Sequence, residues 1–179
     1  MITHLQTIAE TLLSCLCEAV SGAANPPQNC CFRVGDNVTM DADLYTDLCC
    51  EGLAYVSLGE IYPVVDSFPE HSIVTQANQV CSFPSWAISL KAGIIRCVPV
   101  GTDTTMPTCA DWNSTALQQM VDAESLARAA CCFKQAWITS EAGIGMSVVI
   151  GSNTGTAPEG GCVERSITLQ VQTINCPEC

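Results

Sequence analysis

The chain has 179 residues, of which 48% are hydrophobic and only 13% charged, so it is long enough for one domain with a sizeable core and is not intrinsically disordered. The chain has six Lys and Arg residues and 18 Asp and Glu residues, and this net charge of −12 leaves no basic surface that could bind nucleic-acid phosphates. With so few charges, much of the surface can be buried against partners, which favours an oligomer.

The N-terminal sequence and the cysteine content point to different compartments. MITHLQTIAE has neither a basic n-region nor an uninterrupted apolar h-region, so we expect no secretory signal and synthesis in the cytosol. No segment reaches 18 apolar residues, because even AWITSEAGIGMSVVIG is broken by Glu141, and we expect no membrane crossing. The 14 cysteines, however, are typical of oxidising environments. Synthesis inside a cell followed by release through lysis satisfies both observations.

The first expected element is a helix from Leu5 to about Gly22. Its apolar residues fall three and four apart, as on one helix face: Leu5, Ile8, Ala9, Leu12, Leu13, Leu16, Ala19 and Val20. GAANPPQN then supplies a capping glycine and two prolines that end the helix. After it, CCFRV and NVTM flank a turn-like Gly-Asp-Asn, a pattern that predicts a short hairpin.

Two strands follow. Residues 52–64, GLAYVSLGEIYPV, are rich in aromatic and β-branched residues and reach Pro63, which predicts a strand that stops there. Residues 85–98, SWAISLKAGIIRCV, alternate between two faces. The apolar face holds Trp86, Ile88, Leu90, Ala92 and Ile94, and the smaller, more polar face holds Ala87, Ser89, Lys91 and Gly93. PVGTDTTMPTCADWNST is expected as a loop that reaches a helix start near Asn113 to Thr115.

A second helix is predicted from about Thr115 to Trp137. Its small side chains line up on one side, which would let the helix lie close to a flat sheet: Ala116, Met120, Ala123, Ala127, Ala130 and Cys131. Cys131 then serves as a small buried side chain that continues the alanine stripe.

The C-terminal region predicts a long hairpin. GMSVVIG is a strand, SNTGTAPEG is the loop, and CVERSITLQVQTI is the second strand. In that strand Val163, Ile167, Leu169 and Val171 share one face, and Glu164, Ser166, Thr168, Gln170 and Gln172 share the other. The fold class is therefore α+β: a mostly antiparallel sheet with an N-terminal helix and a second helix packed on it, in one domain spanning residues 1–179.

No catalytic, cofactor-binding or metal-binding residue is predicted, and we do not expect an enzyme. His4 and His71 are the two histidines, and neither lies in a recognised catalytic motif. CPEC, at residues 176–179, has the spacing of zinc and thiol-exchange sites. A zinc site needs a second pair, and a redox motif opens a helix, so a terminal disulfide or a loose tail is favoured.

The remaining cysteines are expected to form at least two disulfides in oxidised protein. Three pairs of neighbouring cysteines occur, at 30/31, 49/50 and 131/132. Because neighbouring side chains diverge, each of these cysteines forms a disulfide with a distant cysteine more easily than with its neighbour. Cys132, which lies off the alanine stripe, is a better candidate than Cys131. The glycosylation patterns at Asn37 and Asn113 are treated as chance, because no export signal is expected.

Several segments of the sequence, between residues 5 and 174, resemble neck proteins of long-tailed phages of actinobacteria, especially tail terminators. These are EGLAYVSLGEIYPVVDSFPE, SWAISLKAGIIRCVP, WNSTALQQMVDAESLARAACCF and GGCVERSITLQVQ. The resemblance implies an N-terminal helix, strands, a second helix across the sheet and a closing long hairpin. It implies a ring, usually a hexamer, that caps the tail tube, stops its polymerisation and joins it to the head-completion proteins. The cysteine content exceeds what that plan requires.

The same resemblance implies a place in the virion neck, with assembly in the host cytoplasm and double-stranded DNA passing through the ring. Six copies at −12 each would carry on the order of −70, a charge that would repel DNA from a lumen wall. The acidic residues Asp36, Asp41, Asp43, Asp47 and Glu51 are the candidates for that wall. Three alternatives remain: a head-to-tail adaptor or stopper, a disulfide-rich extracellular binding module, and a thiol or metal protein.

Overall fold

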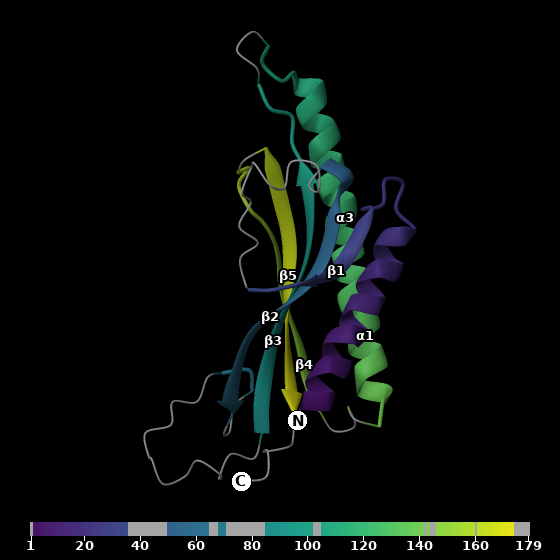
Figure 1. Ribbon diagram of the computed structural model, residues 1–179, viewed down its shortest axis with the longest axis vertical. Helices are drawn as coiled ribbons and strands as arrows, with labels where there is room; N and C mark the ends of the chain where they lie inside the picture. The colour runs from purple at the N-terminus through teal and green to yellow at the C-terminus, as the bar shows by residue number, and fades with distance from the viewer. Residues whose placement is uncertain are drawn as a thin grey trace.

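The computed structural model describes residues 2–35, 50–64, 68–70, 85–101, 105–141, 143, 146–159 and 161–173. Within these residues the chain forms two helices and five strands (Figure 1). In chain order they are α1 (Ile2–Ser21), β1 (Asn29–Arg33), β2 (Leu53–Val64), β3 (Ser85–Cys97), α3 (Cys109–Thr139), β4 (Val148–Gly155) and β5 (Cys162–Thr173).

The strands form one mostly antiparallel sheet in the order β1-β2-β3-β5-β4, which confirms the α+β class and the C-terminal hairpin. Only the β1–β2 pair is parallel among these strands, with Cys31 opposite Tyr55. The strand expected in CCFRV is therefore present as β1, but its described partner is β2. The NVTM segment, expected as the other arm of a hairpin, lies outside the described residues.

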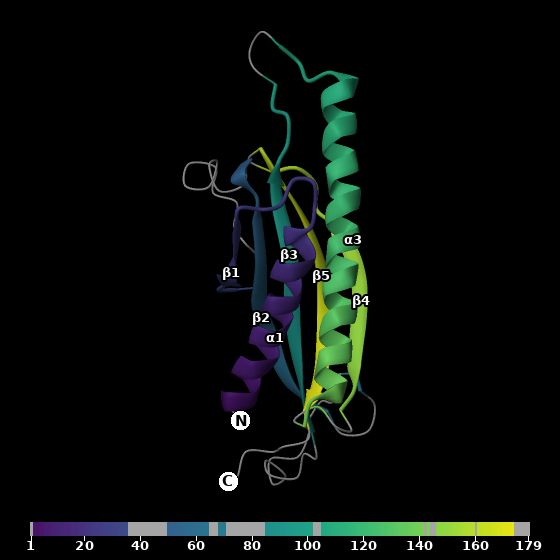
Figure 2. The same ribbon diagram turned by 90° about the vertical axis from the view of Figure 1, so that its right-hand side faces the viewer.

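Both helices pack on the same face of the sheet, side by side (Figure 2). The core between them is built from the alternate residues of the strands and one stripe of each helix. Its fully buried members include Ile8, Leu12 and Leu16 of α1, Val56, Leu90, Ile94, Leu169 and Val171 of the sheet, and Leu126, Phe133 and Trp137 of α3. The expected apolar faces of α1, β3 and β5 thus point to the helices.

Helix α3 begins earlier than expected. Its N-cap is Thr108, not a residue near Asn113, so the last part of the expected loop is helical. Thr108 and Asp111 form a capping box in which each side chain accepts a hydrogen bond from the other residue's backbone N–H. This reciprocal arrangement satisfies two backbone donors at once, whereas a cap at Asn113 would satisfy one.

The expected alanine stripe does not face the sheet. The buried residues of α3 are Asp122, Ser125, Leu126, Ala129, Ala130, Phe133 and Trp137. Of the expected stripe, Ala130 is buried and Ala123 half-buried, while Ala116, Met120, Ala127 and Cys131 are exposed. Burial of a large apolar side chain removes more area from water than burial of an alanine, so Leu126, Phe133 and Trp137 set the orientation of the helix.

The face of the sheet away from the helices also has a buried part. Leu53, Tyr55, Ile95 and Cys162 form a second apolar cluster there, and Glu164, on the predicted polar face of β5, is buried beside them. Strand β4 also reaches Gly155, four residues into the expected loop SNTGTAPEG, with a register shift between Ile150 and Asn153. The Asn153 side-chain amide donates a hydrogen bond to the Ala123 carbonyl of α3 (2.9 Å), which ties this part of β4 to the helix.

Candidate functional site

The most distinctive surface of the molecule is helix α3, whose 31 residues run past the upper end of the sheet (Figures 1 and 2). The first turn lies in the open and is capped by its own residues. The Asp111 carboxylate accepts hydrogen bonds from the Thr108 backbone N–H (2.8 Å) and hydroxyl (2.7 Å). These bonds, the backbone bond foremost, hold the pKa of Asp111 below its usual value. The overhanging end therefore satisfies part of its own backbone hydrogen bonding through the cap.

On the outward side of α3, opposite its buried face, apolar side chains recur at helical spacing, with the exposed charges of Glu124 and Lys134 between them. We call these apolar residues the outer stripe; they are Ala116, Leu117, Met120, Ala127, Cys131 and Ile138, all exposed. Leu117 and Met120 are 63% and 66% exposed. Val100 and Met106, in the segment that leads into the helix, are also exposed. Exposed apolar residues gathered in this way mark contact surfaces more often than single scattered ones do.

A second group of exposed apolar residues lies at the opposite side of the subunit. Phe32 on β1 is 47% exposed, and Leu58 and Ile61 on β2 are partly exposed as well. Strand β1 is one edge of the sheet, whereas α3 lies near the other edge, formed by β4 (Figure 2). The molecule therefore carries two separate groups of exposed apolar residues, one on α3 and one at the β1 edge, and the register places the second group on the helix-covered face of the sheet.

A buried ion pair holds α3 to the sheet where the overhang begins. The Arg96 guanidinium on β3 donates to both carboxylate oxygens of Asp122, through Nε at 3.0 Å and Nη2 at 2.9 Å. Nη2 also donates to the Asn25 carbonyl, and the Gln118 amide donates to Asp122. This charge-assisted, bidentate contact fixes the direction in which α3 leaves the sheet.

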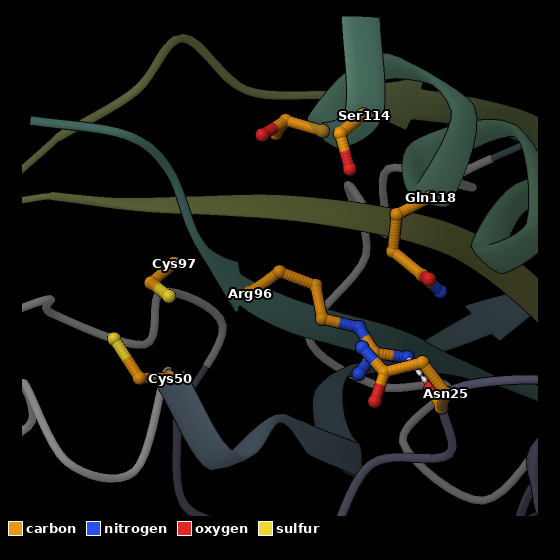
Figure 3. Close-up of a pocket in the computed structure, with 7 residues that line it drawn as sticks. Asn25, Cys50, Arg96, Cys97, Ser114 and Gln118 are labelled. Carbon is orange, nitrogen blue, oxygen red and sulfur yellow. Dashed lines mark hydrogen bonds between the residues drawn. The ribbon is translucent and has the colours of Figure 1, made fainter. Parts of the chain in front are cut away.

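A cavity of about 190 Å³ lies beside this ion pair. Asn25, Cys50, Arg96, Cys97, Ser114 and Gln118 line it (Figure 3). Because Asp122 already balances the Arg96 charge, the cavity has no spare positive charge for an anionic ligand. In the part of the chain that the structure describes, no three His, Cys, Asp or Glu residues come together as metal ligands.

A polar cluster is built into the opposite face of the sheet. The Glu164 carboxylate accepts a hydrogen bond from the Tyr55 hydroxyl (2.6 Å) and pairs with Lys91 (2.7 Å). The Tyr55 ring lies over Gly93, where an added Cβ would come within 2.6 Å of ring atoms. Glycine is thus required under the tyrosine, and the cluster ties β2, β3 and β5 together.

Disulfides fasten α1 to its neighbours, which confirms the expectation of at least two. Cys15–Cys132 joins α1 to α3, and Cys17–Cys30 joins α1 to β1. Cys162 is disulfide-bonded as well. The preference for Cys132 over Cys131 is confirmed, but Cys131 is exposed with a free thiol, so its predicted role as a buried spacer is wrong.

Several residues singled out in the sequence lie outside the described residues: His71, Asn37, CPEC and Asp36, Asp41, Asp43 and Asp47. His4 lies in α1, Glu51 is exposed just before β2, and Asn113 is exposed on α3. The Arg96–Asp122 pair was not predicted from the sequence. One signal was present: Arg96 interrupts an apolar run between Ile95 and Val98, and a buried strand tolerates a cation only when it is paired.

No helix in the described ranges has the length and apolar content needed to cross a bilayer. Comparison with protein-family models found no match for this chain. A search of curated proteins found no match either.

Proposed function

We propose that this chain is a structural subunit of the neck of a long-tailed phage: a tail terminator that forms a ring, caps the tail tube and joins it to the head-completion proteins. DNA passes through the ring in this proposal. The arrangement of elements supports it, because α1, the strands, α3 across the sheet and the β4–β5 hairpin follow the order that the resemblance implies.

The observation that carries the proposal is the outer stripe on the overhanging α3. A ring of identical subunits needs two different, complementary surfaces on each copy, since a head-to-tail contact joins unlike faces. The outer stripe supplies one apolar surface, and the group around Phe32 supplies another near the opposite edge of the sheet. We infer that the outer stripe of one subunit packs against the β1 edge of the next.

Localisation in intact particles tests the proposal directly. Antibodies against the chain, detected by gold labelling in electron micrographs of particles whose genome encodes it, should mark the junction of head and tail. Label on the capsid or the distal tail, or particles that lack the chain, would contradict the proposal.

Solution assembly tests the subunit contact. Light scattering on the oxidised protein should give a ring, with a hexamer expected, that Leu117→Glu or Met120→Glu dissociates because a carboxylate would be buried in the contact. Ala136→Glu adds the same charge at an exposed residue of α3 outside the outer stripe; it is the matched control and should leave assembly unchanged. A ring that survives both charge substitutions would rule out the outer stripe as the contact.

Two other functions have an observation in their favour. The overhang of α3 also fits a head-to-tail adaptor or stopper, which would need a helix directed at the portal. The disulfides Cys15–Cys132 and Cys17–Cys30 fit an extracellular binding module. Cross-linking mass spectrometry of particles separates them: links from α3 to tube subunits favour a terminator, links to the portal favour an adaptor, and a monomer absent from particles favours the binding module.

A further inference from the structure

Two thiols line the cavity that lies beside the ion pair of Arg96 with Asp122. Cys50 and Cys97 are both lining residues, and neither is part of a disulfide. Their sulfur atoms point toward each other across the opening of the cavity (Figure 3). A disulfide forms only where two Cβ–Sγ bonds converge in this way, because the S–S bond is short and its torsion is restricted. The cavity therefore holds two thiols whose side-chain directions suit a disulfide.

The pairing of β2 with β3 brings these two cysteines to the same end of the sheet. Leu53, the first residue of β2, lies opposite Ile95. Cys50 precedes Leu53 and Cys97 follows Ile95, so in an antiparallel pair both lie just beyond this point. Cys97 is also the last residue of β3. The strand register thus sets the approach of the two side chains.

The backbone that follows Cys50 is fixed against its neighbours. Gly52 lies so close to Arg96 that an added Cβ would be 2.7 Å from the guanidinium Nη1. The Glu51 carbonyl accepts a hydrogen bond from the Gln28 N–H (3.1 Å). Because Arg96 directly precedes Cys97, the contact with Gly52 holds the segment after Cys50 against the end of β3.

The two thiols differ in their access to solvent. Cys50 is exposed, whereas Cys97 is half-buried. A small disulfide compound in solution, such as glutathione disulfide, therefore reaches Cys50 first, and Cys97 is placed to attack the resulting mixed disulfide from within the cavity. The folded chain already contains two disulfides at α1, so it is compatible with oxidising conditions.

We propose that Cys50 and Cys97 are a modification site and form a further disulfide when the folded protein meets glutathione disulfide. The Cys50 thiol gives its proton to water, its thiolate attacks one glutathione sulfur, and the other glutathione leaves as a thiolate that takes up a proton. The Cys97 thiol then loses its proton and attacks the Cys50 Sγ. The Cys50–Cys97 bond forms, and the second glutathione leaves in the same way. The two protein thiols are oxidised and glutathione disulfide is reduced to two glutathione thiols, so electrons and protons balance.

The new bond would join the segment before β2 to the end of β3 and close the opening of the cavity. It would lie next to the Arg96–Asp122 pair, which holds α3 to the sheet. Reducing compartments keep thiols open and oxidising surroundings favour the bond, so it would form once the chain has left a reducing compartment. An isolated subunit suffices for this reaction, so the site and the proposed role in the neck can fail separately.

Oxidation of the purified full chain followed by peptide mapping tests the site. Folded protein is incubated with glutathione disulfide at pH 8, quenched with acid, alkylated in denaturant, digested without reduction and analysed by mass spectrometry. Cys50 and Cys97 should disappear together from the alkylated peptides, and a peptide pair linked through them should appear in their place. Fragmentation spectra of the linked pair locate the two joined sulfur atoms.

Three variants separate the steps. Cys50→Ser removes an exposed thiol and should leave Cys97 alkylated, with no linked pair. Cys97→Ser should stop the reaction at a stable glutathione adduct on Cys50, because the second attacking thiol is missing. Cys109→Ser removes an exposed thiol on α3; it is the matched control and should form the linked pair to the wild-type extent.

Three results would overturn the proposal. Cys50 and Cys97 of the treated wild-type protein are both alkylated or both carry glutathione, the linked pair forms only in denaturant, or Cys50 links to a different cysteine.

Discussion

Replacing Asp122 with Asn removes the charge that balances Arg96 while keeping the shape of the side chain. Both groups are almost fully removed from water, with side chains 7% and 1% exposed. Two unit charges about 4 Å apart at an effective dielectric constant of 20 attract each other by about 4 kcal/mol. Loss of one member of a buried pair typically costs about 3–5 kcal/mol, because the other charge is left without a partner. We expect Asp122→Asn to lower the free energy of unfolding by about that amount.

Urea denaturation of the oxidised protein, followed by circular dichroism, measures this change. Glu124→Gln alters the charge of an exposed residue two positions along the same helix and should shift the free energy of unfolding by no more than about 0.5 kcal/mol. The double variant Arg96→Met with Asp122→Leu removes both charges together. It should recover most of the loss, since apolar residues of similar volume replace buried ion pairs at little cost.

Two outcomes would refute the reasoning. A loss below about 1 kcal/mol for Asp122→Asn would mean that water reaches the pair and screens it as it screens surface ion pairs. A double variant no more stable than Asp122→Asn alone would mean that packing around the two side chains, rather than charge balance, holds α3 in place.

Three further results are expected. Gly93→Ala should lower the free energy of unfolding by about 1–3 kcal/mol and reduce the melting temperature, because the new methyl group collides with the buried Tyr55 ring. Cys132→Ser opens a disulfide between residues 117 positions apart, and the conformational entropy that the unfolded chain regains should lower the free energy of unfolding by about 5 kcal/mol in chemical denaturation. NMR titration should show Asp111 losing its proton below the usual pH, and Thr108→Ala should raise the pKa only in part, because the backbone N–H of residue 108 still donates to the carboxylate. Because folding lowers the Asp111 pKa, its stabilising contribution is complete above about pH 4 and is lost as pH falls through the folded-state pKa.

The elements with strong periodicity were predicted well. Strands β3 and β5 and helix α1 lie where alternation or a 3.6-residue repeat placed them, since such patterns report the burial of a whole face. Strand β2 lies where its aromatic and β-branched content predicted a strand. The start of α3 was missed because both Thr108 and Asn113 satisfy the local rule for an N-cap. What decided between them was the reciprocal bonding of Thr108 with Asp111, a feature of two residues rather than of one.

The candidate site was predicted less well, for a related reason. Periodicity describes the faces of one element and does not say which element each face meets. The alanine stripe of α3 was found in the sequence, but its orientation depends on competition with the larger side chains of Leu126, Phe133 and Trp137. The contact of Arg96 with Asp122 joins a strand to a helix 26 residues later, and only the packing of α3 on β3 determines it.

The composition of α3 connects the fold to the proposed assembly. A helix at the surface of an isolated domain is normally apolar on one side and polar on the other, and a helix that is apolar on both sides is normally covered on both sides. Helix α3 is about 46 Å long at 1.5 Å per residue, and two attachments about 15 Å apart, the Arg96–Asp122 pair and the Cys15–Cys132 disulfide, fix it to the subunit. A helix secured in this way presents Leu117 and Met120 at a constant position relative to the β1 edge. Repeated head-to-tail contacts close into a ring only if the angle between them is the same in every copy, and a rigid α3 would keep that angle constant.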